Sequence, residues 1–465
     1  MNFSREFGLR PDIVEKDYVL GWLLAGIFNH SALKLKWVFK GGTCLKKCFF
    51  ETYRFSEDLD FTVIDSEHIR EAFLKNAFAE IAAWVYDQCG IEIPTDTIRF
   101  EVYENPRGRH SVEGRIEYRG PMQQRGSLPR IKLDITDDEA LVLEPIVCEV
   151  HHPYSDSPSE GIQARCYAYE ELFAEKIRAL AERERPRDLY DVIHLYRHGD
   201  INPDRSLVAT TLDAKCRFKG IDVPTVLLLE NKPERVELES EWVNMLAHQL
   251  PVLPPFDQFW QELPQVFAWL SGEAATIEST PYPAQAGEDL AWRPPSWAQP
   301  WGQKIPLEVI RFAAANHLCV DLAYQRSQRL IEPYSLRRTK DGNLLLHAIR
   351  HASGEHRAYR VDQIEGASVT DIPFIPKYAI ELTPAGPLHA PSTQRTSHSP
   401  GRPLSGRGPV RSIKSHHGPL YVIECYACGK RFTHEKYNMK LSKHKDKQGH
   451  PCYGRMGHLI DTKWS

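Results

Sequence analysis

The stretch of sequence that decides the fold runs from Trp37 to Val63 and reads WVFKGGTCLKKCFFETYRFSEDLDFTV. A short apolar run leads into the turn Gly41-Gly42-Thr43, and a second run of strand-forming residues contains Asp58 and Asp60. Successive side chains of a β-strand point to opposite faces, so the two aspartates share one face of their strand. The stretch therefore predicts a glycine turn followed by a strand with one acidic and one apolar face.

Paired carboxylates and a glycine turn together predict a particular kind of ligand. Two carboxylates held side by side repel each other unless a cation lies between them, and oxygen ligands of this kind suit Mg²⁺. Glycines allow backbone amides to approach a phosphate closely, and the hydroxyl of Thr43 can add a donor. The pattern predicts a nucleoside triphosphate held through magnesium. The alternative is a strand with two exposed acids after an ordinary tight turn.

The same residues resemble the nucleotidyltransferase superfamily of the DNA polymerase β type, and more closely the AbiEii toxin family of abortive-infection and toxin–antitoxin systems. That family carries a Gly-Gly-Ser/Thr turn and an Arg-x-Ser-x-Asp-x-Asp strand, matched here by Gly41-Gly42-Thr43 and Arg54-Phe55-Ser56-Glu57-Asp58-Leu59-Asp60. The resemblance implies an α+β fold, a mixed sheet plus helices, that transfers a nucleotide from an NTP. It implies that Asp58 and Asp60 hold Mg²⁺ and that the nucleotide is bound by Gly41, Gly42, Thr43, Lys47, Arg54 and Ser56.

Regular periodicity continues on both sides of this stretch. Apolar spacing predicts helices at 12–28 and 67–87. Alternating residues predict strands at 98–103, 111–118 and 130–136. Nucleotidyltransferases of this type often carry a third carboxylate on a neighbouring strand, and Asp134, in the last predicted strand, is the candidate. A solvent-facing acid is the alternative for Asp134.

Residues 169–197 carry two predicted helices separated by Pro186. The family has a lysine in the first helix and an Arg/Lys-Asp-x-x-Asp run at the start of the second, matched by Lys176 and Arg187-Asp188-Leu189-Tyr190-Asp191. The resemblance implies that Lys176 binds triphosphate oxygens and that Asp191 orients this lysine or acts as a base. Asp188 shares a helix face with Asp191 and is a further catalytic candidate; a helix cap is its alternative role.

Length and composition restrict the class of protein. At 465 residues the chain suggests roughly three domains. It has no run of about 18 apolar residues and no apolar signal core near Arg5 and Glu6, so we expect a cytoplasmic protein that is neither membrane-bound nor secreted. Seven cysteines are scattered along the chain, which fits reduced thiols in a cytosol. They are Cys44, Cys48, Cys89, Cys148, Cys166, Cys216 and Cys319.

Composition also divides the chain into segments. We expect a transferase domain at 1–275, completed by helices from residue 201 onward, and a proline- and tryptophan-rich linker at 276–303. From 304 to 383 one helix and closely spaced strands with polar turns predict a small β-barrel. Proline, glycine, serine and arginine dominate 384–418, which we expect to be a disordered linker.

The segment 304–383 resembles the WYL domain, an SH3-like barrel found in prokaryotic regulators and phage-defence proteins. The match rests on Tyr324, Glu332-Pro333-Tyr334-Ser335-Leu336 and Arg357-Ala358-Tyr359-Arg360-Val361-Asp362-Gln363-Ile364. It departs from the family at Leu344-Leu345-Leu346, where the name-giving Trp-Tyr-Leu would stand. The resemblance implies binding of nucleic acid or nucleotide ligands. Arg357 and Arg360 are candidate contacts, or else partners in surface salt bridges.

Residues 419–460 predict a small metal-binding module. Their order is that of a C2H2 zinc finger, with Cys425-x2-Cys428, Phe432, Leu441, His444 and His450. Thiolates and imidazoles at such spacing suit tetrahedral Zn²⁺, and a segment this polar could hardly fold without the ion. We predict Cys425, Cys428, His444 and His450 as ligands. His434 and Cys452 compete for the fourth position, and Cys452 is the main alternative.

The charge distribution indicates a nucleic-acid partner. Between Gly386 and Ser465 there are fourteen Lys and Arg but four Asp and Glu, a net charge of +10 on a chain whose total is -4. Lysine and arginine supply most of the non-specific affinity for phosphate backbones. A soluble, disordered tail is the alternative.

Two functional hypotheses follow from these patterns. In the first, the protein is a Mg²⁺-dependent nucleotidyltransferase toxin that transfers NMP from an NTP to RNA. The family resemblance implies the 3′ end of tRNA as the acceptor, a toxin–antitoxin or phage-defence context and a separate antitoxin protein; a protein hydroxyl is the alternative acceptor. In the second, the protein is a nucleic-acid sensor or transcription regulator that acts through the WYL barrel and zinc finger, and its transferase fold binds nucleotide without catalysis.

Overall fold

The computed structural model contains two compact units, Met1–Thr396 and Ser397–Ser465. The predicted linker 384–418, and all of 276–303 except 280–289 and Trp292, lie outside the residues that the structure describes. The described residues of the first unit are 11–50, 54–104, 108–123, 126–198, 203–232, 234–273, 280–289, 292 and 307–382. Those of the second unit are 419–425, 428, 430–434, 441, 444–445, 450–452 and 457–464.

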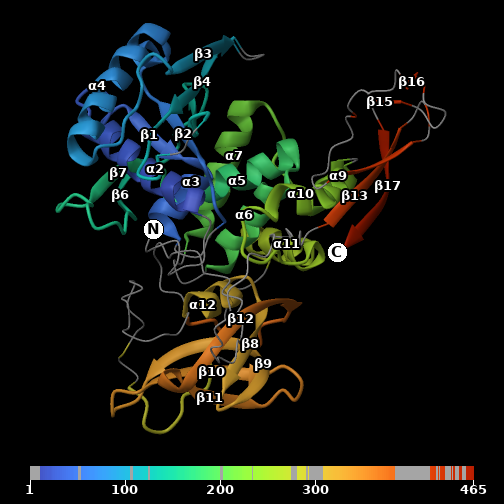
Figure 1. Ribbon diagram of the computed structural model, residues 1–465. Coiled ribbons are helices and arrows are strands. Elements are labelled where there is room, and N and C mark those ends of the chain that lie inside the picture. Colours follow the sequence, from blue (N-terminus) through green and yellow to red (C-terminus); the bar gives the residue numbers. More distant parts are fainter. Residues whose placement is uncertain are drawn as a thin grey trace, which may run out of the picture. The chain divides into compact units, whose positions relative to one another are not determined.

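A mixed sheet of seven strands forms the centre of the N-terminal module, residues 11–273 (Figure 1). Its strands are β1 Trp37–Lys40, β2 Asp58–Val63, β3 Arg99–Glu104, β4 His110–Glu117, β5 Arg130–Thr136, β6 Ile146–Val150 and β7 Ile162–Cys166. The order across the sheet is β3-β4-β5-β2-β1-β7-β6, with β2 parallel to β5 and antiparallel to β1. The strands predicted from alternation are confirmed to within two residues, whereas β6 and β7 were not predicted.

Helices cover the apolar face of this sheet. They are α2 Pro11–Asn29 and α4 Glu71–Cys89, which pack against each other and match the two predicted helices, with the 3₁₀ turn η2 Ser66–Ile69 before α4. Phe61 of β2 is fully buried on this face, and its ring centroid lies 5.0 Å from that of Trp37 and 6.2 Å from that of Phe28. The apolar half of the predicted two-faced strand therefore forms the core.

The predicted glycine turn is followed directly by helix. Gly41 has a φ of +81°, which ends β1, and the chain then enters α3 Gly41–Cys44 and the π-helical segment η1 Leu45–Phe49. Left-handed φ values are accessible to glycine without steric cost. The tight turn expected from the sequence is therefore the start of a helical segment that leads the following side chains into the core.

A group of helices completes the N-terminal module, as predicted. The two helices predicted around Pro186 are α5 Tyr169–Arg183 and α6 Pro186–Arg197. Proline is favoured in the first turn of a helix because its missing amide hydrogen has no intrahelical partner there. The remaining helices are α7 Arg205–Lys219, α8 Val226–Glu230, α9 Glu234–Ser240, α10 Trp242–Leu246 and α11 Phe256–Ser271.

No helix in the described parts of the chain has both the length and the apolar character needed to cross a bilayer.

The middle module, residues 307–382, is a separate antiparallel sheet packed against a helix (Figure 1). Its strand order is β11-β10-β9-β8-β12. The elements are α12 Leu307–Ala315, β8 Leu318–Tyr324, β9 Ser327–Arg338, β10 Leu344–Arg350, β11 His356–Arg360, η4 Val361–Gln363 and β12 Ile364–Pro373. Arg357 pairs with Glu355 and Arg360 pairs with Asp362. Of the two roles proposed for these arginines, the structure shows the surface salt bridges.

The first two modules share a buried polar contact. The hydroxyl of Tyr190 on α6 donates a hydrogen bond of 3.0 Å to Oδ1 of Asn316, which follows α12 directly. Both side chains are fully buried. The helix that carries Asp188 and Asp191 is therefore also bonded to the middle module.

The second unit contains a sheet in the order β14-β13-β17 and a two-stranded ladder of β15 and β16. These strands are β13 Pro419–Cys425, β14 Arg431–His434, β15 His444–Lys445, β16 Pro451–Cys452 and β17 Gly457–Trp464. Ile423, Cys425, Leu441 and Cys452 form its small buried cluster. A core this small needs a further source of stability.

Replacement of Phe61 by alanine should destabilise the first unit by about 3–5 kcal/mol, because it leaves a cavity beside the rings of Phe28, Trp37 and Phe39. Ile64→Ala, which alters a half-exposed side chain just beyond the same strand, should cost less than about 1 kcal/mol. Urea unfolding followed by tryptophan fluorescence measures both. Equal costs for the two variants would contradict the assignment of the core face.

Candidate active site

Three carboxylates lie together on the face of the sheet opposite to the apolar core. In the parallel pairing of β2 with β5, Asp60 lies opposite Asp134 and Asp58 lies opposite Lys132. Residues paired across strands project from the same face, so Asp58, Asp60 and Asp134 form one acidic surface. The register places the predicted third carboxylate directly beside the predicted pair.

The environment of these carboxylates favours a bound cation. Burial raises the pKa of Asp60 to about 6, and the nearby Asp134 and Asp58 contribute in the same direction, against Lys40 and Lys176. Burial also raises the pKa of Asp58. Carboxylates that resist ionisation for these reasons are stabilised when a positive charge neutralises them. The donor set, all oxygen and all acidic, fits Mg²⁺.

The glycine turn packs directly against this acidic surface. A Cβ atom on Gly41 would overlap Oδ2 of Asp60, and one on Gly42 would lie 2.7 Å from Nη2 of Arg54 and 3.0 Å from Oγ of Ser56. Glycine is therefore required at both positions by the closeness of these side chains. Of the six residues predicted to bind the nucleotide, the structure gathers Gly41, Gly42, Arg54 and Ser56 around the turn.

Thr43 and Lys47, the other two, are engaged elsewhere. Thr43 is fully buried and its hydroxyl donates to the backbone carbonyl of Asp58 at 2.5 Å. Lys47 is 2% exposed, with its Nζ 2.8 Å from a carboxylate oxygen of Asp17 and 3.3 Å from the carbonyl oxygen of His151. The helical path of α3 and η1 turns both side chains into the core, and their contact with phosphate stays a prediction. They hold the turn in place.

A buried ion network fixes the cations beside the acidic surface. Arg54 donates two hydrogen bonds of 2.7 and 2.8 Å to Asp191 and one of 3.0 Å to Gln249. The Nζ of Lys176 lies 2.8 Å from the same carboxylate. Burial opposes ionisation of Asp191, but Arg54 and Lys176 outweigh it and hold its pKa well below the usual range. Asp191 is therefore held in its ionised form between the two cations, and this geometry favours the orienting role over that of a general base.

Asp188 is a second anchor in this network. It is fully buried and accepts hydrogen bonds of 2.7 and 2.9 Å from Arg183, and one of its oxygens lies 3.8 Å from the Nζ of Lys176. Its carboxylate bonds to a side chain from the preceding helix, which a simple cap would not do. Asp188 and Asp191 together position Lys176.

Arg187 is a further cation near the acidic surface, and the sequence analysis gave it no separate role. Its Nε is buried without a hydrogen-bond partner among the described residues, and no ion pair within 4.0 Å is seen for it there. Burial and the neighbouring Arg54 lower its pKa, while Asp58 is among the acids that act in the opposite direction. The only sequence signal was its place at the head of the Asp188–Asp191 run. It is a cation beside the acidic surface with capacity for an anionic ligand.

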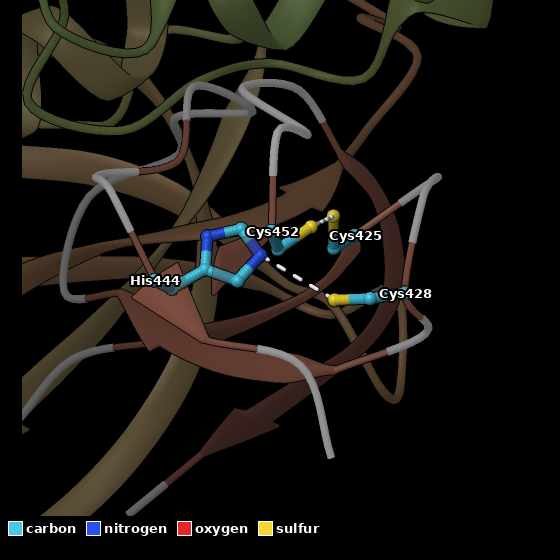
Figure 2. A group of neighbouring side chains, drawn as sticks. All are labelled: Cys425, Cys428, His444 and Cys452. Atoms are coloured by element: carbon cyan, nitrogen blue, oxygen red, sulfur yellow. Dashed lines mark hydrogen bonds between the residues drawn. The ribbon is translucent and has the colours of Figure 1, made fainter. Parts of the chain in front are cut away.

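The second unit contains a separate candidate metal site (Figure 2). The ligand atoms of Cys425, Cys428, His444 and Cys452 all lie within 4.8 Å of one another. Cross-strand pairing of His444 with Cys452 in the β15–β16 ladder brings these two residues together. His450 is exposed and does not belong to the group, so the geometry favours Cys452 over His450 as the fourth ligand. Three thiols and one imidazole suit structural Zn²⁺.

Two family models match the chain. Residues 22–262 match the model described as nucleotidyl transferase AbiEii toxin, type IV toxin–antitoxin system, and residues 306–369 match the WYL domain. No curated protein matches the chain.

The chain is also similar to solved structures. MenT4, a nucleotidyltransferase toxin from Mycobacterium tuberculosis H37Rv, is 19% identical with a TM-score of 0.38, over 59% of this chain and 90% of that one. JHP933 from Helicobacter pylori is 16% identical with a TM-score of 0.36, over 57% of this chain and 94% of that one. Because the first family model covers more than half of the sequence, the chain belongs to the family of AbiEii nucleotidyl transferase toxins of type IV toxin–antitoxin systems.

Proposed function

We propose that this toxin transfers a nucleoside monophosphate from an NTP to RNA, at the 3′ end of tRNA, with release of pyrophosphate. The observation that carries the proposal is the surface formed by Asp58, Asp60 and Asp134 against the glycine turn. Three carboxylates gathered on one face, two of them with pKa values raised by burial, are costly for a fold that has no use for a cation.

Asp58, Asp60 and Asp134 would hold Mg²⁺, which when bound neutralises the triphosphate and stabilises the attacking and leaving oxygens. The protein's own groups bind and orient the nucleotide. Backbone amides at Gly41 and Gly42 can approach the phosphates because no side chain stands in the way. The hydroxyl of Ser56, beside Gly42, adds a donor at the same place.

Two cations complete the nucleotide site. Arg187 takes the role predicted for Lys47, since a guanidinium with no ion pair among the described residues can bind phosphate oxygens in a bidentate way. Lys176 is fixed by Asp191 and Asp188 and adds positive charge near Asp60. Because both cations come from the helices and the carboxylates come from the sheet, the site requires both parts of the N-terminal module.

The remaining parts of the chain support a nucleic-acid acceptor. The C-terminal segment carries the +10 charge, and its Cys/His group would fold it around Zn²⁺. As a member of a type IV toxin family, the protein is expected to have a separate antitoxin as its partner. We propose that it acts in the cytoplasm and contributes to phage defence by abortive infection. The rival hypothesis, a regulator without catalysis, predicts nucleic-acid binding as its main activity.

Asp60→Asn should lower incorporation of label from radioactive NTPs into total RNA by at least about 100-fold, because it removes a charge that would hold the metal. The protein is incubated with Mg²⁺, total RNA and each of the four NTPs in turn. Asp96→Asn, a change at an exposed turn away from the site, is the control and should leave incorporation unchanged.

Three other outcomes of this experiment would count against the proposal. Labelling of protein in place of RNA would show that the acceptor is a protein. Labelling of RNA other than tRNA would show that tRNA is not the target. Incorporation by Asp60→Asn equal to that of the wild type would end the catalytic proposal.

Arg187→Met should lower kcat/KM for the NTP by about 10- to 100-fold, since a charged hydrogen bond contributes about 1.5–3 kcal/mol. Arg185→Met is the matched control, two residues earlier and exposed at the start of α6. Steady-state kinetics with varied NTP measures both variants. Equal effects of the two changes would show that Arg187 does not contact the nucleotide.

Mg²⁺ binding should release protons near pH 6 and none near pH 8. Because the raised pKa leaves Asp60 partly protonated at about pH 6, the cation must displace that proton, and the affinity for Mg²⁺ falls as the pH drops through this range. Calorimetry in two buffers of different ionisation enthalpy measures the release. Asp134→Asn should reduce the release at pH 6, because it removes a charge that raises the pKa of Asp60. A buffer-independent heat at pH 6 would contradict the assignment.

A further inference from the structure

Four of the cysteines that are scattered in the sequence converge in the N-terminal module, behind the glycine turn. The Sγ atoms of Cys44, Cys48 and Cys166 all lie within 4.8 Å of one another. Cys44 ends α3, Cys48 lies in η1, and Cys166 ends β7. The thiol of Cys148, on β6, interacts with that of Cys166. This thiol cluster comprises Cys44, Cys48, Cys148 and Cys166.

Backbone pairing explains why these residues meet. Cys44 and Cys48 are four residues apart on one continuous helical path, so their side chains lie on the same side of it. Cys166 pairs with Phe39 of β1, the strand that leads into this helical path. The amide of His151, one residue beyond β6, donates a hydrogen bond of 2.8 Å to the carbonyl of Lys47 in η1. Three separate parts of the chain are thereby held around the cluster.

The register of β6 with β7 brings in the fourth thiol. Cys148 pairs with Ala164, and Cys166 pairs with Ile146. The two cysteines are therefore diagonal neighbours on the same face of the sheet. Cys44 and Cys166 are buried, whereas Cys48 and Cys148 are partly exposed.

The chemistry of the cluster is that of a soft metal site. Thiolates select ions such as Zn²⁺, and a tetrahedral site with Zn–S bonds of about 2.3 Å places its sulfur atoms about 3.8 Å apart. All ten cysteines of the chain are free thiols, so none of the four is already joined in a disulfide. The buried cation Lys47 lies in the same η1 segment, and its charge favours the thiolate form of Cys48.

We propose that Cys44, Cys48, Cys148 and Cys166 bind a second zinc ion, separate from the one expected in the C-terminal unit. Its role is structural. Cys44 follows Thr43 directly, so the ion fixes the position of the helical segment that begins at Gly41. This segment packs closely against Asp60. The inference does not depend on the proposed reaction, because metal content is measured without substrate.

The test is the zinc content of the full-length protein after loading with Zn²⁺ and removal of free ion, measured by elemental mass spectrometry. Wild type should hold two zinc ions per chain, Cys48→Ser should hold one, Cys428→Ser should hold one, and the double variant should hold none. Cys89→Ser is the matched control. Its thiol is also partly buried but bonds to the carbonyl of Val85, and the variant should keep both ions.

A second measurement leaves the thiol cluster intact and so avoids any folding defect of Cys48→Ser. Cys428→Ser protein, stripped of metal and loaded with Co²⁺, should show the visible absorption of cobalt in a tetrahedral thiolate site. A wild type with one zinc ion that persists in Cys48→Ser and disappears in Cys428→Ser would overturn the proposal. The absence of these tetrahedral thiolate bands from cobalt-loaded Cys428→Ser would overturn it as well.

Discussion

The contact between the backbone of Gly41 and the carboxylate of Asp60 is the constraint on which the rest of the site depends. It leaves no room for a Cβ atom, and so fixes the distance between the start of α3 and the strand that carries the acids. Two residues later, the hydroxyl of Thr43 donates a hydrogen bond to the carbonyl of Asp58 and so makes a second link between this helical segment and β2. The glycine turn and the acidic strand are in this way one rigid piece, and a ligand bound to one is positioned against the other.

The charges of the site are divided between sheet and helices. Strands β2 and β5 supply the anions, whereas Arg54, Lys176 and Arg187 come from a loop and two helices. Asp191 joins these parts by binding Arg54 and Lys176 at once, and its lowered pKa is the measure of that attraction. A buried carboxylate of this kind is stable only when cations neutralise its charge and donate hydrogen bonds to it. Removal of one partner therefore leaves a buried charge without compensation, which destabilises the fold.

Local patterns in the sequence were sufficient to predict most helices and strands. They were also sufficient to predict which residues share a face of one strand or lie in one turn. Periodicity gave the helices α2, α4, α5 and α6, and the two-residue repeat placed Asp58 and Asp60 on one face. Contacts between residues far apart in the sequence depend on strand pairing, which the local patterns do not show. Cys148 and Cys166 are neighbours because β6 pairs with β7. Likewise, Cys452 lies beside His444, and His450 does not, because of the β15–β16 register. The burial of Thr43 and Lys47 could not be predicted, because composition does not show the helical path that follows a glycine pair.

Tyr190 and Asp191 are neighbours on α6 with partners in different modules. Tyr190 bonds to Asn316 after α12, while Asp191 holds Arg54 and Lys176 beside the acidic surface. A displacement of α12 therefore acts through one helix on the carboxylate that positions these two cations. By thermodynamic reciprocity, a free-energy change at the acidic surface acts on α12 to the same extent. The two modules thus share one coupling free energy, which α6 carries.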